Sequence, residues 1–209
     1  MGNFDGTGTA DGLADADQPR VRTRDPERKE RILTAAADLV ARKGFHTVSI
    51  SEIGAAAGIT GSGVYRHFDS KSAVLVALFD RVIDELLREE QTILDTTSDL
   101  SEALNRLVAG QVEFVVGDRN LAQVYHHEIN NLPEEDRRRL RRKQRLYLEE
   151  WVHLVDELRD DLDDTDARVV VHAAIAAIQS TLFHNSGMAE ERLRMLLTQA
   201  ARRVIGVRT

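Results

Sequence analysis

The sequence predicts an all-α protein made of a small helix-turn-helix domain followed by a larger helical region. Only 3 of its 209 residues are proline, and long stretches are rich in Ala, Leu, Arg and Glu, which are strong helix formers. Apolar residues recur at intervals of three and four, the spacing of an amphipathic helix. Two helix-capping patterns follow each other closely between residues 49 and 64, as expected for two short helices joined by a turn.

Residues 1–24 are expected to form a disordered tail that ends in a basic arm. The first 19 residues are rich in Gly, Asp, Thr and Ala, so burial of apolar side chains cannot offset the entropy lost on ordering. Arg20, Arg22 and Arg24 follow in alternation. An arm of this kind can enter the minor groove of DNA, and a solvated linker is an equally good interpretation.

The first helix is predicted to begin after Asp25 and to end before Gly44. Asp25 can act as the N-cap, and Pro26 suits the first helical position because its missing amide would be unpaired there. Gly44 can adopt the left-handed conformation that ends a helix, with Phe45 folding back on Val40. The apolar stripe of this helix consists of Ile32, Ala36, Leu39 and Val40.

The second helix begins with a capping box, in which Ser49 and Glu52 satisfy each other's backbone amides. Val48 and Ile53 flank the box as a hydrophobic staple. Gly58 can supply the left-handed residue of a sharp turn. These features predict a short helix that ends where the turn begins.

The third helix starts directly after this turn, with Thr60 as its N-cap. Val64 and Phe68 are four residues apart and are expected to face the core. The residues expected to point outward are Gly61, Ser62, Tyr65, Arg66 and His67.

A fourth helix follows, capped by Asp69 or Ser70 and carrying Lys71 in its first turn. Its apolar face would consist of Val74, Leu75, Leu78, Phe79, Val82 and Ile83. Capping residues and breaks predict further helices near 100–116, 120–130, 133–158, 165–185 and 189–206.

The stretch between residues 49 and 79 joins these signals in a specific order. The turn Ala57-Gly58-Ile59-Thr60 is followed by Val64-Tyr65, then by Phe68 and Ser70-Lys71. In this pattern residues 28–79 resemble the DNA-binding domain of the TetR family of bacterial regulators. Ser62 stands where the family usually has Gly, and Ser72 where it usually has an acidic residue. Both are small, so the resemblance implies the same docking on DNA with different detailed contacts.

The resemblance implies that four side chains contact the phosphate backbone of DNA. Tyr65 and Lys71 would bind phosphates, with Ser49 and His67 also near the backbone. Taken alone, Tyr65 could be a half-buried aromatic residue and Lys71 a solvated charge, and His67 could pack at the end of its helix.

The same resemblance implies that Thr60, Ser62 and Arg66 read base edges in the major groove. Gly61 and Gly63 are weak helix formers, costing about 1 kcal/mol each. We expect them to be kept because they let the helix approach the DNA closely.

The charge distribution agrees with a local nucleic-acid surface. The net charge is −7, yet residues 20–71 carry ten Lys and Arg against six Asp and Glu, so only this segment is basic. The chain has no Cys, which excludes disulfide scaffolds and thiolate zinc sites and suits a reducing cytoplasm. No export signal, membrane span, metal motif or phosphate loop is recognised, so we expect no membrane association, metal or cofactor.

The resemblance assigns residues 25–71 to DNA binding and residues 72–209 to ligand binding and dimerisation. The last two helices would form a four-helix seam with a second copy, and burial within one monomer is the alternative. Large amphipathic side chains could line a ligand pocket on the central helices, although each could be plain core. These candidates are Phe114, Tyr125, Trp151 and His172.

The basic run from Arg137 to Arg145 is expected to be a solvated helix face. A second interpretation is that it binds the phosphates of an acyl-CoA.

Together these features predict a ligand-responsive repressor that binds a palindromic operator as a homodimer. A small, largely apolar effector, with an acyl-CoA as one candidate, would shift the spacing of the two recognition helices and release the DNA. The alternatives are an architectural DNA-binding protein that needs no ligand, and a helical hydrolase, for which no nucleophile motif is present. The expected protein is therefore a regulator and not an enzyme.

Overall fold

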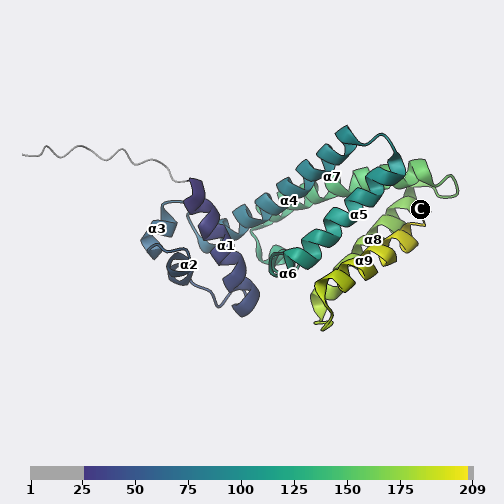
Figure 1. Ribbon diagram of the computed structural model, residues 1–209. Helices are drawn as coiled ribbons and strands as arrows, with labels where there is room; N and C mark the ends of the chain where they lie inside the picture. The colour runs from purple at the N-terminus through teal and green to yellow at the C-terminus, as the bar shows by residue number, and fades with distance from the viewer. Residues whose placement is uncertain (1–25, 207–209) are drawn as a thin grey trace, which may run out of the picture.

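The computed structural model describes residues 26–206, and all regular secondary structure in this range is helical (Figure 1). The predicted tail, the basic arm and the Asp25 cap lie outside the described residues. The α-helices are α1 (Pro26–Lys43), α2 (Ile50–Ala56), α3 (Gly61–Tyr65), α4 (Lys71–Thr96), α5 (Leu100–Gly117), α6 (Arg119–Glu128), α7 (Glu134–Leu158), α8 (Asp164–Gln179) and α9 (Glu190–Ile205). Two short 3₁₀ helices, η1 (Ile129–Asn131) and η2 (Ser180–Phe183), complete the fold.

The helices form two parts that α4 joins. Helices α1, α2 and α3 lie at one end of the molecule, and α4 runs from them into a bundle that contains α5, α7, α8 and α9 (Figure 1). Helix α6 packs against both α1 and α5. The N-terminal helices therefore contact the bundle through α4 and α6.

Helix α1 agrees with its prediction. It starts at Pro26, ends at Lys43, and is followed by Gly44 in the left-handed conformation with φ of 77°. The amide of Gly44 donates to the carbonyl of Val40 at 2.8 Å, which completes the last turn. The predicted apolar stripe is buried.

The turn between α2 and α3 depends on local capping and on close backbone packing. The capping box of Ser49 and Glu52 is present, and Thr60 caps α3 by accepting from the amide of Gly63. Gly58 has φ of 71°, as predicted for the turn residue. A Cβ on Gly54 would lie only 2.9 Å from the carbonyl carbon of Thr60. The two helices can pack this closely only because Gly54 has no side chain.

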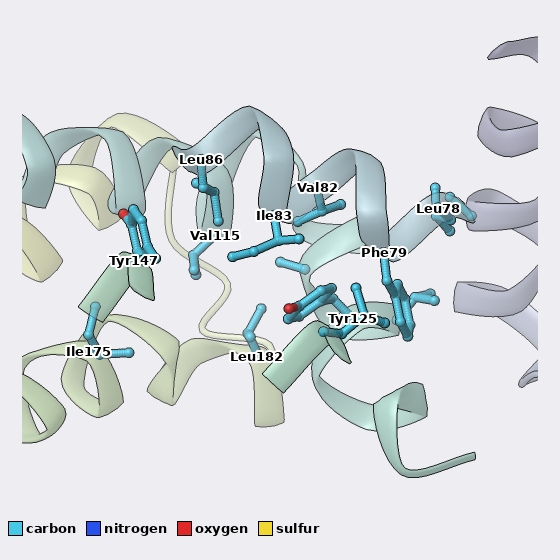
Figure 2. Packing of buried hydrophobic residues seen from close by; sticks show 14 of the residues in the cluster. Leu78, Phe79, Val82, Ile83, Leu86, Val115, Tyr125, Tyr147, Ile175 and Leu182 are labelled. Carbon is cyan, nitrogen blue, oxygen red and sulfur yellow. The ribbon is translucent and has the colours of Figure 1, made fainter. Parts of the chain in front are cut away.

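The apolar face of α4 forms the centre of the bundle. Figure 2 shows Leu78, Phe79, Val82, Ile83 and Leu86 arranged along this helix, beside buried residues of the neighbouring helices. All six predicted apolar residues of α4 are buried. Ser70 caps the helix by accepting from the amide of Ala73 at 3.0 Å. Of the two predicted caps, Asp69 and Ser70, the structure therefore uses Ser70.

The helix predicted at 165–185 ends earlier in the structure. Helix α8 stops at Gln179, and residues Ser180–Phe183 form the 3₁₀ helix η2. The hydroxyl of Ser180 donates to the carbonyl of Ala177 at 2.8 Å. Such a side-chain bond to the preceding turn competes with the regular helical pattern, and the tighter turn buries Thr181 and Leu182.

None of the helices between residues 26 and 206 is both long and apolar enough to cross a membrane.

We predict that Gly54→Ala destabilises the protein by about 1–3 kcal/mol, because the added methyl group overlaps the backbone of Thr60. Gly110→Ala is the matched control, since Gly110 is also helical but a Cβ there would lie 3.8 Å from Glu89 Oε2, an ordinary contact. This control should gain up to about 1 kcal/mol from helix propensity. Urea unfolding measures both changes, and an unchanged midpoint for Gly54→Ala would contradict the packing argument.

Candidate nucleic-acid interface and ligand site

The structure brings most of the predicted DNA-contacting residues together on the exposed side of α3. Val64 and Phe68 are buried in the core, as predicted. Tyr65 is 57% exposed. The other exposed side chains around α3 belong to Thr60, Ser62, Arg66 and His67.

The polar groups at the start of α3 are held in place by one another. Thr60 Oγ1 accepts from the Gly63 amide at 3.1 Å and lies 2.9 Å from Ser62 Oγ. The two hydroxyls thus form a hydrogen-bonded pair that faces solvent. Such a pair presents both donors and acceptors to an incoming polar edge.

Ser49 is exposed but already hydrogen bonded within α2. Its hydroxyl donates to Glu52 Oε2 at 2.8 Å and accepts from the Glu52 amide at 3.2 Å. Lys43 donates to the other carboxylate oxygen at 2.8 Å. The hydrogen bond from Lys43, followed by those from the Ser49 amide and hydroxyl, lowers the pKa of Glu52 to about 2. The role of Ser49 near the DNA backbone stays a prediction.

Lys71 is half-buried, and its ammonium group is bound to the protein's own backbone. Its Nζ donates to the carbonyls of Phe45, His46 and Val48 at 2.7, 3.2 and 2.8 Å. It also lies 4.5 Å from the centre of the Phe45 ring. An ammonium group has three donors, so all three are used. Lys71 therefore fixes the loop between α1 and α2 to the first turn of α4.

Gly61 of α3 has a packing role. A Cβ on Gly61 would lie 3.0 Å from Ser51 Oγ and 3.3 Å from Ser51 Cα, so this position must be small for α3 to pack on α2. Gly63 is buried. The close approach that Gly61 permits in the structure is to α2, whereas a Cβ on Gly63 would make ordinary contacts at 3.4 Å. An approach to DNA at these glycines stays a prediction.

The loop that Lys71 fixes also contacts α6. Glu128, the last residue of α6, accepts from the backbone amide of Phe45 at 3.3 Å. Arg81 of α4 forms an ion pair with Glu30 of α1. These contacts join α1 and the loop that follows it to α4 and α6.

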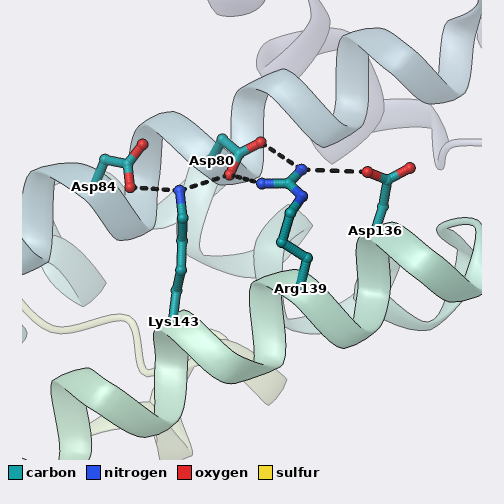
Figure 3. Close-up of polar contacts among 5 residues, drawn as sticks. All are labelled: Asp80, Asp84, Asp136, Arg139 and Lys143. Atoms are coloured by element: carbon teal, nitrogen blue, oxygen red, sulfur yellow. Dashed lines mark hydrogen bonds and ion pairs between the residues drawn. The ribbon is translucent and has the colours of Figure 1, made fainter.

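Part of the predicted solvated face at Arg137–Arg145 connects α7 to α4. Arg139 donates to both carboxylate oxygens of Asp80, at 2.5 and 2.7 Å, and Lys143 contacts Asp80 and Asp84 at 2.9 and 2.6 Å (Figure 3). Burial opposes ionisation of Asp80, but the hydrogen bonds from Arg139 and Lys143 outweigh it and lower its pKa. The prediction of a solvated face was therefore incomplete, because Arg139 and Lys143 bind carboxylates of α4. These partners are distant in sequence, so the sequence alone did not indicate them.

The four predicted ligand residues are not brought together. Tyr125 and Trp151 are buried, and neither Tyr125 Oη nor Trp151 Nε1 has a hydrogen-bond partner. Phe114 is half-buried and lines a cavity of about 540 Å³ bordered by α1, α4, α5 and α6. His172 lies on the exposed side of α8, so its assignment to an interior pocket has no support in the structure.

Four further buried polar residues were missed by the sequence analysis, namely Glu90, Gln111, Tyr147 and Thr181. A signal for two of them is present in the sequence. Glu90 follows Ile83 and Leu86 at helical spacing, and Gln111 similarly follows Leu107 and Val108. A polar residue inside an apolar stripe indicates a buried polar site.

Helices α8 and α9 expose apolar side chains on the molecular surface. Val169 is 65% exposed, and Met195 and Val204 are each 39% exposed. Ala173 and Ala176 are also exposed on α8. The apolar residues of these two helices divide between two faces, because Ala174, Ile178, Leu193, Leu197 and Ile205 are buried within the monomer.

Comparison with known proteins agrees with this architecture over most of the chain. Residues 32–78 match the model of the bacterial regulatory proteins of the tetR family, and residues 97–183 match that of the tetracyclin repressor-like C-terminal domain. The first match contains the helix-turn-helix, and the second extends from the end of α4 to η2.

Individual relatives are similar over both parts. The fatty acid metabolism regulator protein of Bacillus subtilis is 24% identical over 165 residues, which cover 74% of this chain and 83% of that protein. The transcriptional repressor KstR2 of Mycolicibacterium smegmatis is 27% identical over 154 residues, covering 69% and 74%. The crystal structure of FadR from Bacillus subtilis in complex with stearoyl-CoA superposes with a TM-score of 0.70 at 22% identity, covering 86% and 99%. With its helix-turn-helix, its helical C-terminal region and these matches, the chain belongs to the TetR family of transcriptional regulators.

Proposed function

We propose that this protein is a ligand-responsive repressor that binds a palindromic operator as a homodimer and is released by a small, largely apolar effector. The observation that carries the proposal is the exposed face of α3, which follows the loop and helix α2 that Lys71 fixes to the start of α4. A DNA-binding regulator acts where the chromosome is, so we place its function in the cytoplasm and assign it no catalytic activity.

The exposed residues around α3 supply the proposed DNA contacts. We assign Tyr65 and His67 to phosphates and Arg66 to a base edge, since a guanidinium can donate two hydrogen bonds to guanine. The hydroxyl pair of Thr60 and Ser62 would read an adjacent base. Lys71 is reassigned from phosphate binding to loop anchoring, because its donors are already used.

The exposed face of α8 and α9 supports the proposed dimer. Small and apolar side chains cover it, including Val169, Ala173, Ala176 and Val204. Small residues allow helices of two copies to pack closely, and apolar surface of this kind is characteristic of a homodimer interface. Two recognition helices joined in this way could enter successive major grooves about 34 Å apart.

The relatives support an acyl-CoA as the candidate effector. One is named for fatty acid metabolism, and one structure of similar fold contains stearoyl-CoA. A long acyl chain would gain about 0.8 kcal/mol for each methylene that it buries in the apolar C-terminal region.

The first test is binding to the DNA upstream of the protein's own gene, with and without stearoyl-CoA. We expect a shifted band at moderate salt, and at least tenfold weaker apparent affinity when stearoyl-CoA is added. Coenzyme A alone is the control, because it lacks the acyl chain. Failure to bind this DNA at any salt concentration would contradict repression of its own promoter, and binding that ignores stearoyl-CoA would favour the architectural alternative.

If α8 and α9 form the dimer interface, we predict that Val169→Glu yields monomers, because the substitution would place one charge from each copy in an apolar interface. Size-exclusion chromatography with light scattering measures the mass, and we expect operator affinity to fall at least tenfold. Leu146→Glu is the matched control, since Leu146 is similarly exposed but lies on α7. A Val169→Glu variant that remains dimeric would contradict this interface.

Lys71 is assigned to anchoring the loop and Arg66 to a base edge, so Lys71→Met and Arg66→Ala should have different effects on stability and on DNA binding. Lys71→Met should lose about 2 kcal/mol of stability, because it removes hydrogen bonds from a charged group, and should keep the salt dependence of DNA binding. Arg66→Ala should leave stability within about 0.5 kcal/mol and weaken operator binding by about 1–3 kcal/mol. If Lys71→Met lowers the slope of log K against log salt by about one, Lys71 binds phosphate after all.

A further inference from the structure

A cluster of buried polar side chains lies between α4, α5 and α7. Its members are Glu90 of α4, Gln111 of α5, and Tyr147 and Trp151 of α7, each no more than 5% exposed. Tyr147 donates to Gln111 Oε1 at 3.2 Å, and the rings of Tyr147 and Trp151 lie 6.0 Å apart. We call this set the buried polar cluster.

Two atoms of the buried polar cluster make no hydrogen bond of good geometry, namely Glu90 Oε1 and Trp151 Nε1, although the indole N–H also lies near the hydroxyl of Tyr147. Buried polar groups are nearly always paired, because an unpaired group loses its bonds to water without replacement. Two unpaired groups in one cluster therefore indicate a place that a ligand atom completes. The surroundings are otherwise apolar, and Figure 2 shows Leu86 and Val115 in the same part of the core as Tyr147.

Burial, together with the charge of a neighbouring glutamate, favours the neutral form of the Glu90 carboxyl group. Helix α7 contributes Glu150 and the phenol of Tyr147, and α5 contributes the uncharged Gln111. Burial, followed by repulsion from Glu150, raises the pKa of Glu90 to about 8. At pH 7 the group is mainly a carboxylic acid, which has an O–H to donate.

The cluster therefore offers two donors, the O–H of Glu90 and the N–H of Trp151. A carbonyl oxygen can accept from both and brings no charge into the core. An ammonium group would leave the indole N–H unpaired, and a carboxylate would bring a second negative charge close to Glu150.

We propose that Glu90 and Trp151 bind the carbonyl oxygen of the effector, specifically that of an acyl thioester, inside the C-terminal region. This inference rests on the proposed function, because it assumes that an acyl-CoA reaches the core. It adds that the protein recognises the thioester group as well as the acyl chain.

The test compares stearoyl-CoA with S-octadecyl-CoA, a thioether that lacks only the carbonyl oxygen. Trp151 is the single Trp of the chain, so its fluorescence reports directly on the cluster. For the wild type we expect at least tenfold tighter binding of stearoyl-CoA and a change of Trp151 emission that the thioether does not cause. Stearic acid is a third ligand and should bind more weakly than the thioester, because its carboxylate would place a negative charge at the position of the carbonyl oxygen, close to Glu150.

Substitutions at Glu90 provide matched variants. Glu90→Gln keeps a neutral donor and should retain the preference for the thioester. Glu90→Leu removes the donor and should bind the two CoA compounds with affinities that differ less than threefold. If Glu90→Gln behaves like Glu90→Leu, the carboxylate charge is what matters, and a cationic ligand replaces the proposed one.

The remaining outcomes separate this inference from the proposed function. If both CoA compounds bind equally and release DNA, the carbonyl site is wrong while the regulator stands. If neither binds while the operator complex forms, both the site and the acyl-CoA effector are wrong.

The charge state of Glu90 has a readout without ligand. The unfolded chain releases this proton near the ordinary pKa of 4.5, whereas the folded chain holds it to about 8. Stability should therefore fall as the pH rises across this window, and the midpoint of urea unfolding should fall less in Glu90→Gln than in the wild type. Identical pH profiles for the two proteins would show that Glu90 is ionised in the fold and would overturn the proposal.

Discussion

The ammonium group of Lys71 determines how the two parts of this protein are joined. It sits in the first turn of α4 and donates to three carbonyls of the loop between α1 and α2. That loop leads directly into the capping box of Ser49, from which α2 and then α3 follow. Because the charge meets its partners in a half-buried setting, the loop cannot move far from α4 without leaving a cation unpaired. The orientation of α3 thus follows the position of α4.

Helix α4 is itself held by contacts along its length. Asp80 and Asp84 bind Arg139 and Lys143 of α7, and Arg81 binds Glu30 of α1. Helix α6 reaches the same loop as Lys71, through Glu128 and the Phe45 amide. A ligand between α4 and α7 that separates these helices would therefore act on the loop by two routes. Under the proposed function, this arrangement would connect the effector site physically to the DNA-binding end, as a coupling between two sites requires.

The sequence predicted features that depend on near neighbours and missed those that depend on distant ones. The capping box at Ser49 and Glu52, the Thr60 cap and the Gly58 turn involve residues within five positions, and all were predicted. The partners of Lys71 lie 23 to 26 positions away, and those of Arg139 and Lys143 about 60 positions away. These cations could be singled out from the sequence, but the groups that they bind could not be predicted from it. Glu90 interrupted an apolar stripe, a signal that becomes meaningful only once α5 and α7 are known to cover it.

The distribution of satisfied and unsatisfied polar groups differs between the two ends of the molecule. Around the helix-turn-helix, Glu52, Thr60 and Lys71 all have partners at short distances, so this end should keep one shape with or without DNA. Among α4 to α8 and η2, polar atoms of Glu90, Tyr125, Trp151 and Thr181 are buried without partners. A core with unpaired polar groups is less stable than a fully apolar core, because these groups lose their hydrogen bonds to water without replacement. A ligand that supplied the missing partners would recover that stability only in the conformation that holds it, so the proposed effector would bind one state of the bundle more tightly than another.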